Sequence, residues 1–355
     1  MTAILEETSP VDIQIKMMDF YASLSKMIPV LSSLEEITNE VTPHDVVLQI
    51  DKTRLLRYRS DNQSKYKVPI LVVYALINHP YILDLQNKSM IKSLLNAGFD
   101  VYLLDWSTPD VEESTLTIDD YLKRYLDRCV DTVRNMSKSE KVTLFGYCMG
   151  GTFSSIYTVL HKEKVKNLIT LAPPVDCSKD TTVFGSISKF LDIDTIVDTL
   201  GNIPPAFQYQ FFMMLKPFKH FLGKYHEISQ KISNNNDVKD FLRVEKWLWD
   251  TAPLPGEVFR QWIKDFYQKN LFAQNMLQIG PNVIDLRRID IPLLNIVAEH
   301  DHLVTPESSL ALNCLVSSSD NTPMSFPTGH VGLCASTFAK REVWPKIIHW
   351  LGERS

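Results

Sequence analysis

Residues 141–160 contain a cysteine that lies between two glycines and two apolar segments. Gly146, Cys148 and Gly150 have the G-x-nucleophile-x-G spacing of a nucleophile elbow, with cysteine in the place of the usual serine. The run 141–145 reads as a short buried strand, and 152–160 reads as a helix. An elbow needs this context, because its glycines permit a strained turn that lifts one side chain out of the sheet. A plain glycine turn with a buried cysteine is the alternative, and the flanking strand and helix favour Cys148 as a nucleophile.

Strand-like and helix-like segments alternate along the chain from about residue 46. The strand-like runs are 69–74, 101–106, 142–147, 168–173, 293–298 and 323–326. The helix-like runs are 88–97, 118–136, 152–160, 306–316 and 340–351. Alternation of this kind predicts a mostly parallel sheet with helices on both faces. Together with the elbow, it predicts an α/β-hydrolase fold.

The alternation stops between residues 176 and 275, where the sequence is aromatic and helical in character. Hydrolase folds carry their caps in insertions at this point, so we expect an inserted helical cap (lid) at 176–275. The catalytic core then comprises residues 46–175 and 276–355. Residues 1–45 are expected to form an N-terminal helical arm, because apolar side chains recur at helical spacing between Met17 and Leu31. This arm can pack on the core or on a partner.

A cysteine nucleophile needs a base, and the base needs a group that orients it. In this fold the expected chain order is nucleophile, then an acid after a late strand, then a histidine in a later loop. Asp301 follows the strand-like run 293–298, and His330 lies in a loop between Gly329 and Gly332. The sequence therefore predicts a Cys148–His330–Asp301 triad. His300 and His302 flank Asp301 and are left outside the triad, although His302 can line the site.

The oxyanion hole of such a site uses two backbone N–H groups. One is expected from Met149, directly after the nucleophile. The second is expected from the loop after the strand-like run 69–74, with Ile77 as the candidate. No G-x-S-x-G motif occurs in the chain, so no competing serine elbow is visible.

Composition and charge argue against several classes of protein. The formal net charge is −5, and no long basic run occurs, which argues against a nucleic-acid-binding protein. No apolar run is long enough to span a membrane. The five cysteines show no paired spacing, so neither a disulfide framework nor a metal motif is expected. Residues 1–10 lack the cationic and apolar regions of a signal peptide, and we expect a cytoplasmic protein without a metal or organic cofactor.

Several stretches besides the elbow resemble the polyhydroxyalkanoate synthase family, whose elbow also carries cysteine. They are Tyr74-Ala-Leu-Ile-Asn78, Tyr81-Ile-Leu-Asp84, Gly98-Phe-Asp-Val-Tyr-Leu-Leu-Asp-Trp106, Gly201-Asn-Ile-Pro-Pro205, Pro255-Gly256, Phe259-Arg-Gln-Trp-Ile-Lys-Asp-Phe-Tyr267, and the segments around Asp301 and His330. The similarity covers nearly the whole chain. The short length resembles the catalytic subunit of the two-component enzymes. Residues 119–131 are closer to class III and residues 146–152 to class IV, so both classes stay open.

The resemblance implies a function and partners. The substrate would be a 3-hydroxyacyl-coenzyme A and the product a polyester, with coenzyme A released. Cys148 would carry the acyl group, His330 would be the general base, and Asp301 would support His330. The resemblance also implies a second, non-homologous subunit, self-association through the cap, and residence at the surface of polyhydroxyalkanoate granules.

Two other functions stay open on the sequence. The same triad would serve an acyl-coenzyme A thioesterase or ester hydrolase, which would release free 3-hydroxy acid instead of polyester. A catalytically idle hydrolase fold that coats granules would release no coenzyme A, and its Cys148 would resist thiol reagents.

Overall fold

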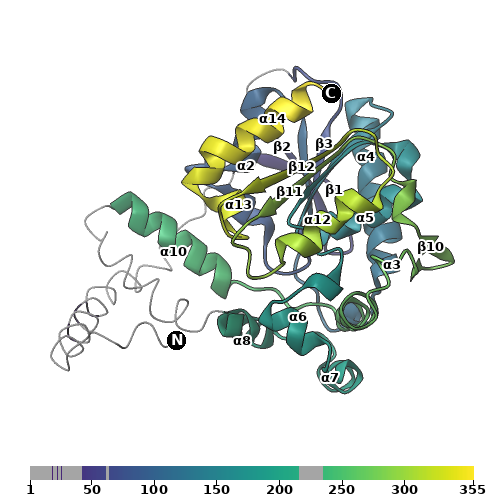
Figure 1. Cartoon of the computed structure of the whole chain (residues 1–355). Coiled ribbons are helices and arrows are strands. Elements are labelled where there is room, and N and C mark those ends of the chain that lie inside the picture. The colour runs from purple at the N-terminus through teal and green to yellow at the C-terminus, as the bar shows by residue number, and fades with distance from the viewer. Residues whose placement is uncertain (1–17, 19–21, 23–24, 26–41, 61–63, 216–234) are drawn as a thin grey trace.

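The computed structural model describes residues 42–60, 64–215 and 235–355, together with Met18, Ala22 and Ser25. An eight-stranded sheet forms its centre (Figure 1). The strand order is β1-β2-β6-β3-β7-β8-β11-β12. The first two strands pair antiparallel with each other, β2 pairs antiparallel with β6, and the remaining neighbours are parallel. The strands are β1 (His44–Ile50), β2 (Thr53–Tyr58), β3 (Ile70–Val73), β6 (Val101–Asp105), β7 (Val142–Tyr147), β8 (Val165–Leu171), β11 (Leu293–Ala298) and β12 (Asn321–Phe326).

The central strands are buried along their whole length. Every residue of β3, β6, β7 and β11 is buried, as expected for parallel strands that helices cover on both faces. Helices α2 (Met90–Ala97) and α14 (Trp344–Gly352) lie on one face of the sheet (Figure 1). Helices α4 (Asp127–Ser137), α5 (Met149–Leu160) and α12 (Pro306–Leu315) lie on the other (Figure 1). The predicted parallel sheet and its two helical layers are therefore confirmed.

The hairpin of β1 and β2 was not expected from the sequence. Its outer strand β1 is mostly half-buried or exposed, and the polar Gln49 interrupts its apolar residues. An edge strand of this kind gives a weak apolar pattern, because only one side of it faces the core. The strand begins at His44, just before the boundary expected between residues 45 and 46.

Helix α2 begins later than the sequence suggested. Lys88 and Ser89 form the short strand β5 (Lys88–Ser89), which pairs with β4 (Asp84–Leu85). Ser89 then caps the helix by accepting a hydrogen bond from the backbone N–H of Lys92 at 2.8 Å. The helix therefore starts at Met90 instead of Lys88.

Residues 176–275, which we call the cap segment, lie between β8 and β11 and are helical in their described part. Their α-helices are α6 (Val183–Ser188), α7 (Ile193–Leu200), α8 (Pro205–Leu215), α10 (Asn235–Trp249) and α11 (Gly256–Gln261). The π-helix η9 (Trp262–Gln268) continues α11. An antiparallel bridge between Ile203 and Leu254 ties the two halves of the cap segment together. The division into core and cap stays a prediction, and most of the expected N-terminal arm lies outside the described residues.

No helix in the described part of the chain is both long and apolar enough to cross a membrane.

Candidate active site

Cys148 occupies a strained turn between β7 and α5. Its backbone angles are φ 54° and ψ −127°, which a non-glycine residue rarely adopts. Two hydrogen bonds hold this turn. The Cys148 N–H donates to the Leu171 carbonyl at 2.8 Å, and the Gly151 N–H donates to the Cys148 carbonyl at 2.8 Å. The thiol therefore stands at the N-terminus of α5, where the helix dipole favours negative charge.

The two glycines of the motif are needed because other backbone comes very close to them. A Cβ atom at Gly150 would overlap the Val73 carbonyl oxygen and lie 2.7 Å from the Tyr74 carbonyl oxygen. A Cβ atom at Gly146 would overlap the backbone of Gly150. The motif glycines thus let α5 pack directly against the ends of β3 and β7.

His330 and Asp301 meet at the ends of β12 and β11. The His330 Nδ1 and the Asp301 Oδ2 are 2.6 Å apart, and the two residues are only 9% and 6% exposed. The other carboxylate oxygen, Oδ1, accepts hydrogen bonds from the N–H groups of Leu303 at 2.8 Å and Val304 at 3.0 Å. Backbone donors therefore fix the carboxylate, and the carboxylate fixes the imidazole.

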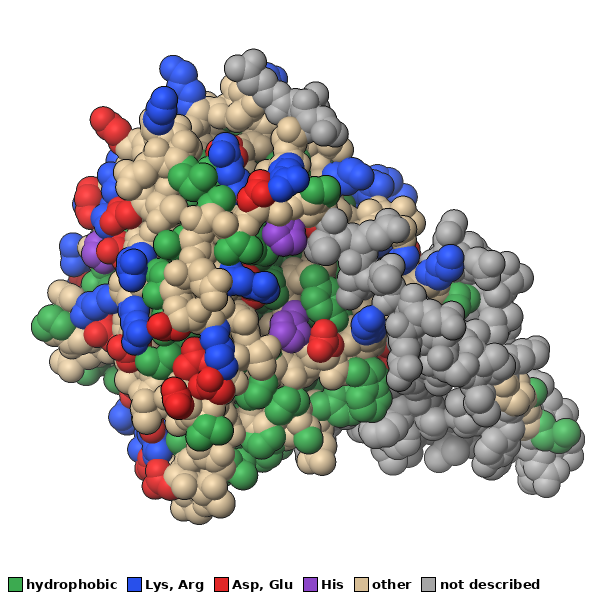
Figure 2. Space-filling model, turned by 180° about the vertical axis from the view of Figure 1, so that it is seen from behind, with side chains coloured by type: hydrophobic (Ala, Val, Ile, Leu, Met, Phe, Trp, Pro, Cys, Tyr) green, Lys and Arg blue, Asp and Glu red, His purple; other side chains and the backbone are tan. Residues whose placement is uncertain are grey.

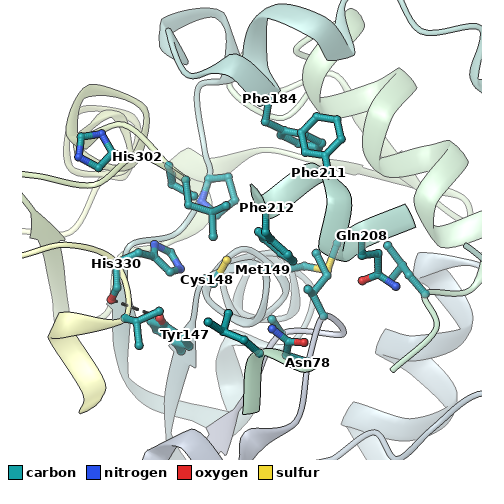
Figure 3. Close-up of a pocket in the computed structure, with 18 of the residues that line it drawn as sticks. Asn78, Tyr147, Cys148, Met149, Phe184, Gln208, Phe211, Phe212, His302 and His330 are labelled. Carbon is teal, nitrogen blue, oxygen red and sulfur yellow. Dashed lines mark hydrogen bonds between the residues drawn. The ribbon is translucent and has the colours of Figure 1, made fainter. Parts of the chain in front are cut away.

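The surroundings of His330 raise the pKa of its imidazole. Burial by itself disfavours the imidazolium, but the Asp301 carboxylate and the Cys148 sulfur outweigh it and raise the pKa of His330 to about 10. The Cys148 sulfur is also a hydrogen-bonding partner of the imidazole. Figure 3 shows the sulfur and the ring pointing toward one another. The structure thus brings together the three residues that the sequence singled out, and their catalytic roles stay predictions.

A cavity of about 700 Å³ lies over Cys148 and is lined mainly by aromatic and aliphatic side chains. Met149 and Ile77, the expected oxyanion donors, both line it. Met149 is the first residue of α5, where N–H groups lack a partner within the helix. Ile77 lies in the loop after β3. His300 and His302 also line the cavity, while the hydrogen bond to Asp301 comes from His330.

Two polar residues of this site were missed by the sequence reasoning. The Tyr147 hydroxyl donates to the His330 carbonyl at 3.2 Å and so steadies the histidine loop (Figure 3). Gln208, on α8, lines the opposite side of the cavity (Figure 3). The position of Tyr147 inside the elbow was a signal that could have been used. Nothing in the sequence around Gln208 marks it, because only the packing of the cap segment brings it to the cavity.

The other four cysteines differ from Cys148 in their surroundings. Cys129, Cys177 and Cys334 are buried, and burial raises the pKa of Cys129 and Cys334 to about 12. Burial also raises the pKa of Cys177 well above its usual value. Such thiols stay protonated and unreactive. Cys314 is exposed. Among the described residues, no group of His, Cys, Asp and Glu side chains could hold a metal ion.

Comparison with solved structures shows the same fold. The chain superimposes on a lipase from Sulfolobus solfataricus described as putative, with a TM-score of 0.57 and 13% identity over 90% of this chain and 100% of that chain. A monoacylglycerol lipase from Paleococcus ferrophilus gives a TM-score of 0.55 and 18% identity over 84% and 99% of the two chains. The alpha/beta hydrolase fold model matches residues 68–333. The predicted fold class is therefore confirmed.

Comparison with characterised sequences is more specific. The family model for the N-terminus of poly-beta-hydroxybutyrate polymerase (PhaC) matches residues 35–94. The poly(3-hydroxyalkanoate) polymerase subunit PhaC of Allochromatium vinosum is 44% identical over 342 residues, which is 96% of each chain. The PhaC subunit of Synechocystis is 41% identical over 328 residues, 90% of this chain and 87% of that protein. Together with the cysteine elbow and the hydrolase fold, these matches show that the chain belongs to the poly(3-hydroxyalkanoate) polymerase PhaC subunit family.

Proposed function

We propose that this chain polymerises 3-hydroxyacyl-coenzyme A into a polyester and releases coenzyme A, through a covalent thioester on Cys148. The observation that carries the proposal is the buried His330–Asp301 pair beside a strained cysteine in an apolar cavity. Membership of the PhaC family supplies the substrate class. An acyltransferase of this kind needs no cofactor beyond the coenzyme A thioester itself.

In acylation, His330 takes the proton of the Cys148 thiol. The Cys148 sulfur attacks the thioester carbonyl carbon, and the N–H groups of Met149 and Ile77 stabilise the oxyanion that forms. The bond to the coenzyme A sulfur then breaks, and this sulfur takes the proton from the His330 imidazolium. Because one thioester replaces another of similar energy, the acyl group stays activated for transfer.

Acylation also changes the state of His330. The Asp301 carboxylate is the larger of the causes that raise its pKa, and the Cys148 sulfur adds to it. Once the sulfur carries an acyl group, its contribution is lost and the pKa of His330 falls. This fall favours the neutral imidazole, which is able to accept a proton.

Ester formation uses this neutral imidazole. His330 takes the proton of a 3-hydroxyl group while its oxygen attacks the thioester carbonyl carbon. The bond to Cys148 breaks, the sulfur leaves as a thiolate, and His330 is again an imidazolium beside it. One proton thus passes through His330 in each half of the cycle. Asp301 stabilises the imidazolium and fixes the ring that carries it.

The reaction products test this proposal. With purified chain and a 3-hydroxyacyl-coenzyme A, we expect insoluble polyester and free coenzyme A. Free 3-hydroxy acid without polyester would instead identify a thioesterase. Cys148→Ala should release no coenzyme A, and substantial release by that variant would contradict the nucleophile assignment.

A partner subunit is part of the proposal, because the characterised relatives are named as subunits. The cap segment offers exposed hydrophobic side chains for association with a partner, a second copy or the polyester granule: Phe190 is 89% exposed and Trp249 is 59% exposed. Figure 2 shows hydrophobic side chains gathered along the lower edge of the molecule, where the cap helices lie. We expect the isolated chain to polymerise with a lag and a co-expressed second subunit to shorten it. Full activity without a lag from the chain alone would contradict this part.

A further inference from the structure

The loop 74–79, which carries Ile77, is fastened at both ends by tryptophan side chains. The indole N–H of Trp106, from the core, donates to the Tyr74 carbonyl at 2.8 Å. The indole N–H of Trp247, from α10 in the cap segment, donates to the His79 carbonyl at 2.8 Å. Core and cap segment therefore each hold one end of the loop from which the second oxyanion donor is expected.

Asn78, in the middle of this loop, has an unusual backbone. Its φ is 64°, a left-handed conformation that asparagine tolerates better than most residues. The residue is only 7% exposed, and its side chain lines the cavity (Figure 3). Whatever holds Asn78 in place also holds the peptide that joins Ile77 to Asn78. Through the Ile77 Cα this peptide limits the direction of the preceding one, which carries the Ile77 N–H.

The Thr251 hydroxyl holds Asn78 from the cap segment. It donates to the Asn78 Oδ1, and the Leu248 carbonyl oxygen, at 2.9 Å from the same hydroxyl, is a second acceptor. Thr251 is itself buried, with 7% of its surface exposed. It lies two residues past the end of α10, so its position depends on the cap segment and not on the sheet.

The segment around Thr251 is held firmly within the cap segment. Ile203 and Leu254 exchange two backbone hydrogen bonds, of 2.8 and 3.1 Å. The Gln208 amide donates to the carbonyls of Ala252 at 2.8 Å and Ile203 at 3.2 Å. Thr251 therefore reaches Asn78 from a fixed support.

We propose that Thr251 is a positioning residue which, through Asn78, orients the Ile77 N–H toward the oxyanion. The inference rests on the proposed function, because it assumes that a thioester is attacked at Cys148. It assigns the cap segment a part in catalysis: the oxyanion hole has one donor fixed by the sheet, at Met149, and one fixed by the cap segment. Removing the Thr251 hydroxyl should then slow only those reactions that build an oxyanion.

Two reactions of the same sulfur separate this role from a general structural one. Acylation by a 3-hydroxyacyl-coenzyme A builds an oxyanion, whereas alkylation of Cys148 by iodoacetamide displaces iodide and builds none. Both rates are measured in a Cys314→Ser background, by rapid-quench release of coenzyme A and by mass spectrometry of the Cys148 peptide. For Thr251→Val we expect acylation to slow by about tenfold to 100-fold, with alkylation unchanged within about twofold. Thr251→Ser, which keeps the hydroxyl, should restore acylation.

A matched hydrogen bond elsewhere provides the control. The Thr170 hydroxyl donates to the Asn295 Oδ1 at 2.8 Å, between β8 and β11, and both residues are fully buried. Thr170→Val removes the same kind of bond from the core, so it should lower the free energy of unfolding and leave both rates of Cys148 unchanged. Trp247→Phe removes the donor to the His79 carbonyl and should reproduce the selective loss of acylation. This variant replaces Thr251→Val in the experiment if Thr251→Val does not fold.

Acylation at the wild-type rate in both Thr251→Val and Trp247→Phe would overturn the inference, and so would an equal loss of acylation and alkylation. Failure of the proposed function itself would look different. In that case Cys148→Ala would still release coenzyme A, whatever the Thr251 variants do.

Discussion

The two walls of the cavity are built in different ways. The wall under Cys148 is made of backbone: the ends of β3, β7 and β8 meet the first turn of α5 at distances that admit no side chain at Gly146 or Gly150. The facing wall is made of side chains from α8 and α10, such as Gln208 and Trp247, which bond to backbone carbonyls. Backbone contacts at the end of the sheet therefore fix Cys148, while the far side of the cavity depends on side-chain hydrogen bonds. We therefore expect substitutions in the first wall to cost far more than substitutions in the second.

The largest effect is expected at the nucleophile. Cys148→Ser should bring coenzyme A release close to zero, because a hydroxyl is much less acidic than a thiol and the same imidazole cannot ionise it comparably. Cys314→Ser, at an exposed cysteine outside the cavity, is the control and should keep normal release. Steady-state assays with a 3-hydroxyacyl-coenzyme A measure both. A serine variant that releases coenzyme A at most of the wild-type rate would show that the reaction does not require a thiol at position 148.

The next largest effect should come from the glycine contacts. Gly150→Ala places a methyl group on the Val73 carbonyl oxygen, and we expect it to lower the free energy of unfolding by about 3 kcal/mol. Gly329→Ala is the control, because a Cβ atom there meets only the His300 carbonyl oxygen, at 3.6 Å. Urea unfolding compares the two variants. Equal stability for both would mean that the elbow tolerates a shift of α5 and that the close backbone contacts at Gly150 are not required.

Asp301→Asn should separate the two half-reactions. Thiol and imidazole exchange a proton readily, so acylation should be largely retained as a near-stoichiometric burst of coenzyme A. Deprotonation of an alcohol is harder, and without the carboxylate the imidazolium that forms is no longer stabilised. We therefore expect very slow turnover after the burst in a rapid-quench experiment. A burst that slows as much as turnover does would show that Asp301 serves both steps equally.

The same variant should change the titration of His330. Its pKa is raised to about 10, so in the wild type the imidazolium persists until the pH rises through that value. Because the Asp301 carboxylate opposes the effect of burial, Asp301→Asn should lower the pKa of His330, and the ring should lose its proton at a lower pH. NMR of histidine-labelled protein follows this titration. An unchanged pKa in the variant would mean that the carboxylate does not govern the charge of the ring.

The smallest effect is expected on the outside of the cap segment. Arg260 pairs with Glu257 at 3.0 Å, with Asp198 at 2.5 Å, and with Asp194, and the side chains of Asp194 and Asp198 are at least half exposed. Because water screens the charges of these exposed carboxylates, Arg260→Ala should lower the free energy of unfolding by only about 1 kcal/mol, although Arg260 itself is half-buried. Turnover should be unaffected, because Arg260 does not line the cavity. A large loss of activity would show that the outer face of the cap segment also takes part in catalysis.

Much of the site could be predicted because its residues follow a local rule. The elbow is contained in five consecutive residues, and Asp301 follows a strand whose apolar run is clear. The strand before His330 has only scattered apolar residues, and the glycines at 329 and 332 marked that loop instead. In a parallel sheet the carboxyl ends of the strands meet at one edge, so the order of strands along the chain already places these residues together. The hairpin of β1 and β2 escaped notice because the apolar run of its edge strand is only three residues long.

The fold class, the elbow and the order of the three residues at the strand ends could be predicted from the sequence, because each depends on neighbouring residues and on strand order. The contacts by which the cap segment reaches the site became visible only in the folded chain. Thr251 and Asn78 are 173 residues apart, and Gln208 meets Ala252 across 44 residues. Contacts of this kind produce no periodic pattern of residues in the sequence. They form only when helices with interrupted apolar patterns pack against the core.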